Sequence, residues 1–179
     1  MQKPDVRKMI MEEAKKIGET RYIDTVTVKE ICAKCGISRP TFYAYFHDKY
    51  DLVNKIHYST IEEAFKASEQ GAPWNIVIGN IMTSIRGSRK FYMNSIKYSG
   101  QNALKDIMLE YTYKGYVLVF IKRSEIEPDK DLLNDLRFNA YGTTGLMLDW
   151  IRAGMKEDPY EIAQNICICM PDKMKPYYL

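Results

Sequence analysis

The chain has 179 residues, of which 46% are apolar and 27% are charged, and its formal net charge is +3. This size allows one large domain, or a small domain joined to a larger one, with a filled core. The longest apolar run, residues 116–121, is far shorter than the roughly 20 residues of a membrane-spanning helix, and residues 1–10 lack the apolar core of a signal peptide. We expect a cytoplasmic protein with no membrane partner.

The positive charge is concentrated at the start of the chain. Residues 1–56 contain 11 Lys and Arg against 8 Asp and Glu, whereas residues 57–179 contain 15 of each. A local basic bias is expected where a protein approaches phosphates.

Proline and glycine residues separate segments of helical spacing, which predicts an all-α protein of about nine helices. The first helix is expected over residues 4–19. Thr27 and Glu30 form a capping-box pattern, which predicts a second helix ending near Cys35. Gly36 then supplies a turn, because glycine tolerates a positive φ.

Ser38 is the expected N-cap of a third, short helix that reaches about Phe46, with Pro40 in its first turn. Asp48 is expected to cap a long helix that runs to about Gln70. The remaining helices are predicted over residues 74–86, 89–98, 102–123, 130–155 and 160–170.

A capped helix, a glycine turn and a short helix indicate a helix-turn-helix motif at about residues 28–47. Phe42 and Phe46 lie one helical turn apart and are expected in the core with Ile31 and Ile37. The small side chain of Cys32 would let the two helices cross closely.

The opposite face of the third helix carries groups suited to DNA. Arg39 offers a planar fork to guanine or to a phosphate, and the methyl groups of Thr41 and Ala44 suit thymine. The other candidates are expected to contact phosphates, which position a protein without specifying sequence. They are Tyr43, Tyr45 and Lys49.

The stretch TVKEICAKCGISRPTFYAYFHDKYDL, residues 27–52, resembles the DNA-binding region of TetR-family (TetR/AcrR) transcriptional regulators. The resemblance covers about residues 5–56. It implies a three-helix DNA-binding domain over residues 1–56 and a larger helical regulatory and dimerisation domain over residues 57–179. It also implies nine DNA-contacting residues: Thr27, Ser38, Arg39, Pro40, Thr41, Tyr43, Ala44, Tyr45 and Lys49.

Residues 91–111 and 142–155 are similar to the branch of that family containing the activator of dihydroxyacetone kinase operons. Members of this branch include regulators that respond through a protein co-activator. The expected function is a homodimeric regulator that binds an inverted-repeat operator in double-stranded DNA. Its effector is a small molecule or a protein co-regulator, and repression and activation both stay open.

Aromatic side chains spread over the later helices suggest an effector pocket with apolar walls and polar tips. The candidates are Phe65, Tyr92, Tyr111, Phe138 and Tyr141. An apolar strip on the last two long helices is the candidate dimer interface. It comprises Leu146, Met147, Trp150, Ile151, Ile162 and Ile166. For both sets the alternative is ordinary filled core.

The sequence disfavours two other classes of function. An enzyme is disfavoured because the sequence has no Ser-His-Asp set, no phosphate-binding glycine loop and no paired His/Cys metal spacing. The pairs Cys32/Cys35 and Cys167/Cys169 are interpreted as packing residues, so neither a cofactor nor a metal is expected. A protein adaptor that no longer reads DNA is disfavoured by Arg39, Thr41 and Tyr43.

Overall fold

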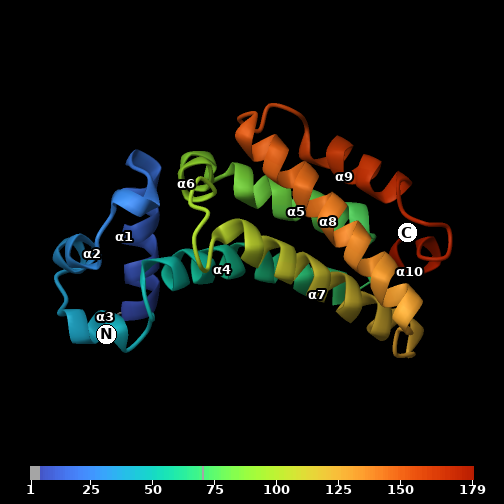
Figure 1. Ribbon diagram of the computed structural model, residues 1–179, viewed down its shortest axis with the longest axis horizontal. Coiled ribbons are helices and arrows are strands. Elements are labelled where there is room, and N and C mark those ends of the chain that lie inside the picture. The colour runs from blue at the N-terminus through green and yellow to red at the C-terminus, as the bar shows by residue number, and fades with distance from the viewer. Residues whose placement is uncertain (1–4, 70) are drawn as a thin grey trace. The chain divides into compact units, whose positions relative to one another are not determined.

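The structure is a computed structural model that describes residues 5–69 and 71–179 (Figure 1). Over these residues it contains ten α-helices, one 3-10 turn and no strand, which confirms the all-α prediction. The elements in chain order are α1 Val6–Thr20, η1 Ile23–Thr25, α2 Val28–Cys35, α3 Arg39–Tyr43, α4 Lys49–Glu69, α5 Trp74–Arg86, α6 Arg89–Ser95, α7 Leu104–Ser124, α8 Lys130–Arg152, α9 Pro159–Ile168 and α10 Lys175–Tyr178.

Most helix boundaries lie close to those predicted. α3 ends at Tyr43, before Phe46, and the N–H of His47 then donates to the carboxylate of Asp51 at 2.8 Å instead of to a helix carbonyl. α6 ends at Ser95 and leaves Tyr98 outside the helix. The predicted end of the fourth helix, Gln70, lies outside the described residues. The short α10 was not predicted.

The chain divides into two compact units. The first comprises the residues up to Ser59 together with Ser88–Leu104, and the second comprises Thr60–Gly87 and Lys105–Leu179. A segment distant in sequence therefore belongs to the unit that contains the first three helices.

In the first unit α1 packs against both α2 and α6. Gly18 permits the close approach of α6, because a Cβ atom at this position would lie 2.7 Å from Cδ2 of Phe91. Asn94 secures the same contact by donating its amide N–H to the carbonyl oxygen of Gly18 at 2.8 Å. The α6 segment is thus fixed to the end of α1 by packing and by a hydrogen bond.

In the second unit α5 packs against α9. Trp74, Tyr116 and Tyr178 form an aromatic core with ring centroids 5.0 to 5.7 Å apart. The hydroxyl of Tyr178 on α10 is buried and donates to the carbonyl oxygen of Tyr116 at 2.6 Å, which fixes this tyrosine in the core. Arg123 closes this end of the unit by donating to the carbonyl oxygens of Ala72 and Tyr177.

Candidate nucleic-acid interface

The start of α2 is fixed by the predicted capping box. Thr27 Oγ1 accepts from the N–H of Glu30 at 3.2 Å, and Glu30 Oε2 accepts from the N–H of Thr27 at 2.9 Å. Arg21 donates to the same carboxylate at 2.9 Å. The hydrogen bonds from Thr27, followed by that from Arg21, lower the pKa of Glu30 to about 2, so the cap stays charged at neutral pH.

The turn between α2 and α3 has the geometry that the sequence predicted. Gly36 adopts φ 63°, in the left-handed region that glycine enters without strain, and the N–H of Ile37 donates to the carbonyl of Cys32 at 3.0 Å. Ser38 Oγ accepts from the N–H of Thr41 at 3.2 Å, and their two hydroxyl oxygens lie 2.8 Å apart. Ser38 is therefore the N-cap of α3.

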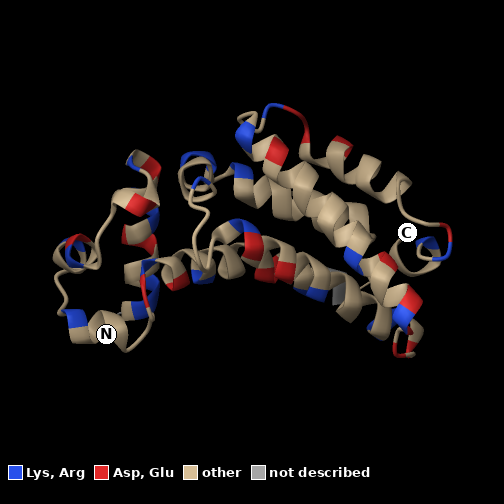
Figure 2. Cartoon of the chain, viewed as in Figure 1, with Lys and Arg blue, Asp and Glu red and all other residues tan. Residues whose placement is uncertain are grey.

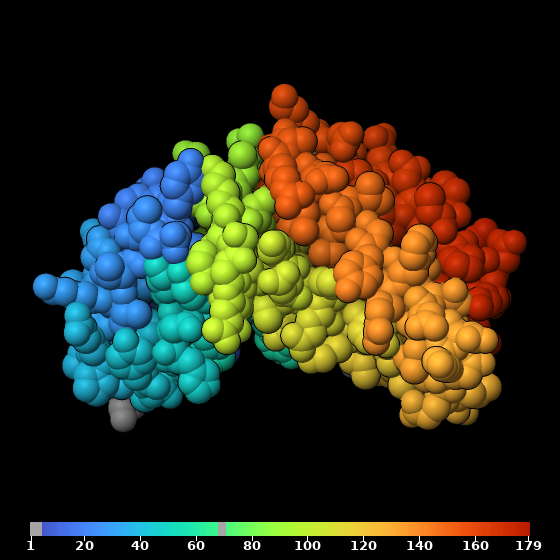
Figure 3. All heavy atoms as spheres, in the orientation of Figure 1, coloured from blue at the N-terminus to red at the C-terminus, as the bar shows by residue number. Residues whose placement is uncertain are grey.

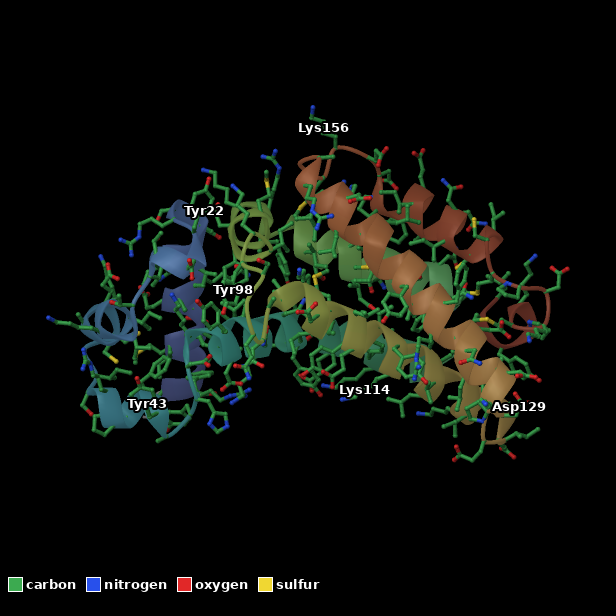
Figure 4. The ribbon with its side chains drawn as sticks, viewed as in Figure 1. Tyr22, Tyr43, Tyr98, Lys114, Asp129 and Lys156 are labelled. Atoms are coloured by element: carbon green, nitrogen blue, oxygen red, sulfur yellow. The ribbon has the colours of Figure 1, made fainter. Side chains whose placement is uncertain are left out.

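α3 has two contrasting faces. Phe42 and Phe46 are buried, as is Ile31 of α2, and Ile37 is half-buried, so the predicted core face is confirmed. On the other face Tyr43 is 54% exposed; Figure 4 labels it on α3. Exposed or half-buried beside it are the other candidates from this stretch: Thr27, Ser38, Arg39, Pro40, Thr41, Ala44 and Tyr45.

Together these candidates carry one cation, two phenols, three small hydroxyl residues and two short apolar groups. A guanidinium recognises guanine or phosphate with two parallel hydrogen bonds. Methyl groups contact thymine, and phenol hydroxyls reach phosphate oxygens. The set has the chemistry of a DNA-reading surface.

Lys49 differs from the other candidates because most of its side chain is covered. Its ammonium donates to the carbonyl oxygens of Asp24 at 2.6 Å and of Val26 at 2.9 Å, and only 17% of the side chain is exposed. An ammonium has three N–H donors. Two of them bind the carbonyl oxygens of Asp24 and Val26, and the nitrogen also lies 3.9 Å from Oδ1 of Asp24. One N–H remains outside these two hydrogen bonds.

α4 begins in the way the sequence predicted. Asp48 Oδ1 accepts from the N–H groups of Tyr50 and Asp51, each at 2.7 Å. Lys55 donates to the carboxylate of Asp51 and to the carbonyl oxygen of Tyr45, each at 2.9 Å. The segment joining α3 to α4 is thereby held by side chains of the long helix.

The five candidate pocket residues are not brought together. Tyr92 belongs to the first unit, where its hydroxyl lies 3.1 Å from Nδ1 of His57. Phe65 packs beside Trp74 in the second unit, and Tyr111 is half-buried on α7. Phe138 and Tyr141, both on α8, are 78% and 59% exposed.

The six candidate interface residues divide between core and surface. Met147, Trp150, Ile151 and Ile166 are buried within the second unit, and Trp150 donates its indole N–H to the carbonyl oxygen of Glu157 at 3.0 Å. Ile162 is half-buried, and Leu146 is 49% exposed.

Two of the four cysteines are buried, as expected for packing residues. Cys32 and Cys167 are buried, Cys35 is half-buried and Cys169 is exposed. Burial raises the pKa of the Cys35 thiol and raises that of Cys167 to about 11, which disfavours thiolate chemistry. Across residues 5–69 and 71–179 no cluster of His, Cys, Asp and Glu could hold a metal ion.

None of the helices within the described part of the chain is both long and apolar enough to cross a membrane.

The helix-turn-helix with its exposed reading face defines the class of DNA-binding transcription regulators. Residues 10–56 match the family model described as bacterial regulatory proteins, tetR family, and residues 73–172 match the model of a transcriptional regulator C-terminal region. The chain belongs to the TetR family, whose members are transcription factors and not enzymes.

Solved structures share the fold over nearly the whole chain. The dihydroxyacetone kinase operon activator DhaS is 15% identical with a TM-score of 0.71, covering 98% of this chain and 99% of that one. A tetR-family regulator from Streptomyces coelicolor is 16% identical with a TM-score of 0.63, covering 99% and 88%. The fatty acid degradation regulator FadR from Bacillus halodurans is 11% identical with a TM-score of 0.62, covering 93% and 94%. A comparison with curated proteins gives no significant match.

Proposed function

We propose that the protein is a cytoplasmic, sequence-specific regulator that binds an inverted-repeat operator in double-stranded DNA as a homodimer. The main support for this proposal is that α3 has one buried face and one exposed face. Phe42 is fully buried, whereas Tyr43 beside it is 54% exposed and Arg39 lies on the surface one turn away. We assign base reading to Arg39, Thr41 and Ala44. The assigned backbone contacts are Thr27, Ser38, Pro40, Tyr43, Tyr45 and the remaining donor of Lys49.

This function is tested by fluorescence anisotropy of the purified protein on labelled fragments from upstream of its own gene. We expect at least one fragment to bind about a thousandfold more tightly than a shuffled fragment of equal composition at the same salt concentration. A protein adaptor that no longer reads DNA would bind both fragments alike, and that result would overturn the proposal.

We assign the homodimer interface to the exposed face of α8, which lies on the visible surface of the second unit in Figure 3. Residues 138–148 carry no charged side chain, so charges lie only toward the two ends of this helix (Figure 2). Gly142 and Gly145 have no atom within 4 Å of an added Cβ. Mid-helix glycine costs about 1 kcal/mol relative to alanine, so two glycines without an internal packing role suit close contact with a second copy.

The exposed apolar side chains on this face are Phe138, Tyr141 and Leu146. We propose them as contacts in place of the buried Met147, Trp150, Ile151 and Ile166. The half-buried Ile162 of α9 is kept as a contact at the edge of the proposed interface. A side chain already enclosed by its own protomer has no apolar area left to bury against a partner.

We further propose that a small molecule or a protein co-regulator modulates DNA binding through the second unit. In its aromatic core the hydroxyl of Tyr116 lies 2.9 Å from Oγ1 of Thr143, so this apolar region contains a buried polar pair. Because coupling is reciprocal, an effector must bind with a different affinity when operator is present. Calorimetric titration of each candidate effector with and without operator tests this, and equal affinities for every effector that binds would contradict it.

A further inference from the structure

The segment between α6 and α7 is attached to the start of α4 by a pair of stacked aromatic rings. The ring of Tyr98 lies on the ring of Tyr50 with the centroids 4.0 Å apart and the planes within 11°. Figure 4 labels Tyr98 in this segment. Both residues belong to the first unit, although the helix-turn-helix family model ends at residue 56.

Tyr50 connects this stack to η1. Its hydroxyl donates to Oδ1 of Asp24 at 2.7 Å. Burial, together with this hydrogen bond, raises the pKa of Tyr50 well above its usual value, so the phenol stays a donor at any physiological pH. Lys49 also holds Asp24, by donating to its carbonyl oxygen at 2.6 Å.

Two more side chains secure the segment. Lys97 donates to the hydroxyl of Tyr22 at 2.8 Å, just after the end of α1. Asn54 on α4 donates its amide N–H to the carbonyl oxygen of Asn102 at 3.2 Å. The segment from Lys97 to Asn102 is thus tied to the α1–η1 junction and to the first turns of α4.

Asp24 lies three residues before Thr27, the N-cap of α2. The placement of η1 against α4 therefore sets how the chain enters α2. α2 in turn carries α3 through the Gly36 turn and the hydrogen bond from Ile37 to Cys32. These contacts form a continuous chain from Tyr98 through Tyr50, Asp24 and α2 to α3.

We propose that Tyr98 is a positioning residue for DNA recognition, because its ring, stacked on Tyr50, fixes the Tyr50–Asp24 hydrogen bond and through it the orientation of α2 and α3. This inference rests on the proposed DNA-binding function. Sequence reading depends on the angle at which α3 meets the base edges, whereas the attraction of cations to phosphates is much less directional. Disturbing the stack should therefore reduce the affinity for the selected DNA site more than the affinity for a random duplex.

The test compares full-length variants on the DNA site that the wild-type protein selects and on a random duplex, at two salt concentrations. Tyr98→Leu removes the stack but keeps apolar bulk, and Tyr98→Phe keeps the ring. We expect Tyr98→Leu to lose about tenfold on the selected site, equivalent to one base contact, with unchanged affinity for the random duplex and an unchanged salt slope. Tyr98→Phe should stay within about twofold of the wild type.

Tyr50→Phe keeps both stacked rings and removes the hydroxyl that bonds to Asp24, so it is the variant to use if Tyr98→Leu does not fold. It should show the same selective loss. Amide hydrogen exchange over residues 23–28 gives a readout that needs no DNA, and exchange there should be faster in Tyr98→Leu and Tyr50→Phe than in Tyr98→Phe.

A merely structural role for the ring predicts equal losses on both DNAs, and that outcome overturns the proposal. If Tyr98→Leu discriminates between the two DNAs as well as the wild type does, the proposal is also wrong, but the proposed DNA-binding function still holds. A wild-type protein that shows no discrimination overturns the proposed function and this inference together.

Discussion

Lys49 donates from its ammonium nitrogen to the backbone carbonyl oxygen of Asp24 at 2.6 Å, a contact between residues 25 positions apart. The same nitrogen donates to the carbonyl oxygen of the buried Val26. One side chain in the first turn of α4 thus satisfies two carbonyl groups that immediately precede α2. Lys49 therefore fixes the chain entering the helix-turn-helix and also adds a positive charge there.

Replacing Lys49 by alanine is expected to destabilise the protein by about 1–3 kcal/mol, because the Val26 carbonyl would be left buried without this partner. Urea unfolding measures the loss. Lys34→Ala, at an exposed position on α2, is the matched control and should change stability by less than about 0.5 kcal/mol. Equal effects of the two substitutions would show that the Lys49 contacts carry no stability.

Arg39→Lys should separate charge from base reading. Lysine keeps the positive charge, so the salt dependence of binding should be unchanged, but it lacks the planar fork. We expect a loss of about 1–3 kcal/mol in discrimination at one base position of each half-site. Binding to a panel of single-base variants of the site measures it. A variant that discriminates at every position as the wild type does would remove Arg39 from the base-reading set.

His57 should make stability fall as the pH drops below neutrality. Burial lowers its pKa to about 4, so between pH 6.5 and 4 the unfolded chain binds the proton more strongly than the folded protein does. This histidine thus contributes its full stability above pH 6.5 and loses it as the pH falls toward 4. The expected loss between pH 7.5 and pH 5 is about 2 kcal/mol.

Urea unfolding at several pH values gives this curve for the wild type and for His57→Gln, which cannot titrate. The curve of the variant should be flatter over pH 6.5–5, where few carboxylates contribute. Parallel curves for the two proteins would mean that His57 does not titrate as its burial requires.

The double substitution Phe138→Asp, Leu146→Asp should convert a dimer to a folded monomer, because each new carboxylate would lose its hydration at the proposed α8 interface. Sedimentation equilibrium distinguishes the 20.9 kDa chain from twice that mass. Leu118→Asp with Ile126→Asp changes two similarly exposed apolar residues away from α8 and should leave the dimer intact. A dimeric double α8 variant would place the interface elsewhere.

The caps and the turn of the helix-turn-helix could be predicted from the sequence, because each depends on residues no more than four positions apart. The capping box of Thr27 and Glu30, the cap at Ser38 and the turn at Gly36 each follow from the residue types at short spacing. The stack of Tyr98 on Tyr50 could not be predicted, because no local pattern links two tyrosines 48 positions apart.

The faces of α8 show a second limit of local sequence patterns. Its middle stretch, residues 138–148, has no charged residue on any face, so periodicity alone cannot decide which face points inward. The structure buries Met147 and Ile151 and exposes Phe138 and Tyr141. Aromatic content indicated a pocket, but the two most exposed of its five candidates lie on the outer surface of this helix.

Selection from randomised duplexes by the purified full-length protein tests whether α3 reads DNA in a twofold-symmetric pair. We expect an enriched inverted repeat whose half-site centres lie about 34–36 Å apart or slightly more, one helical turn of DNA. The variant Arg39→Ala should lose the enrichment at one position in each half-site. A selection that enriches no sequence, or enriches one without twofold symmetry, would contradict this symmetric reading by α3.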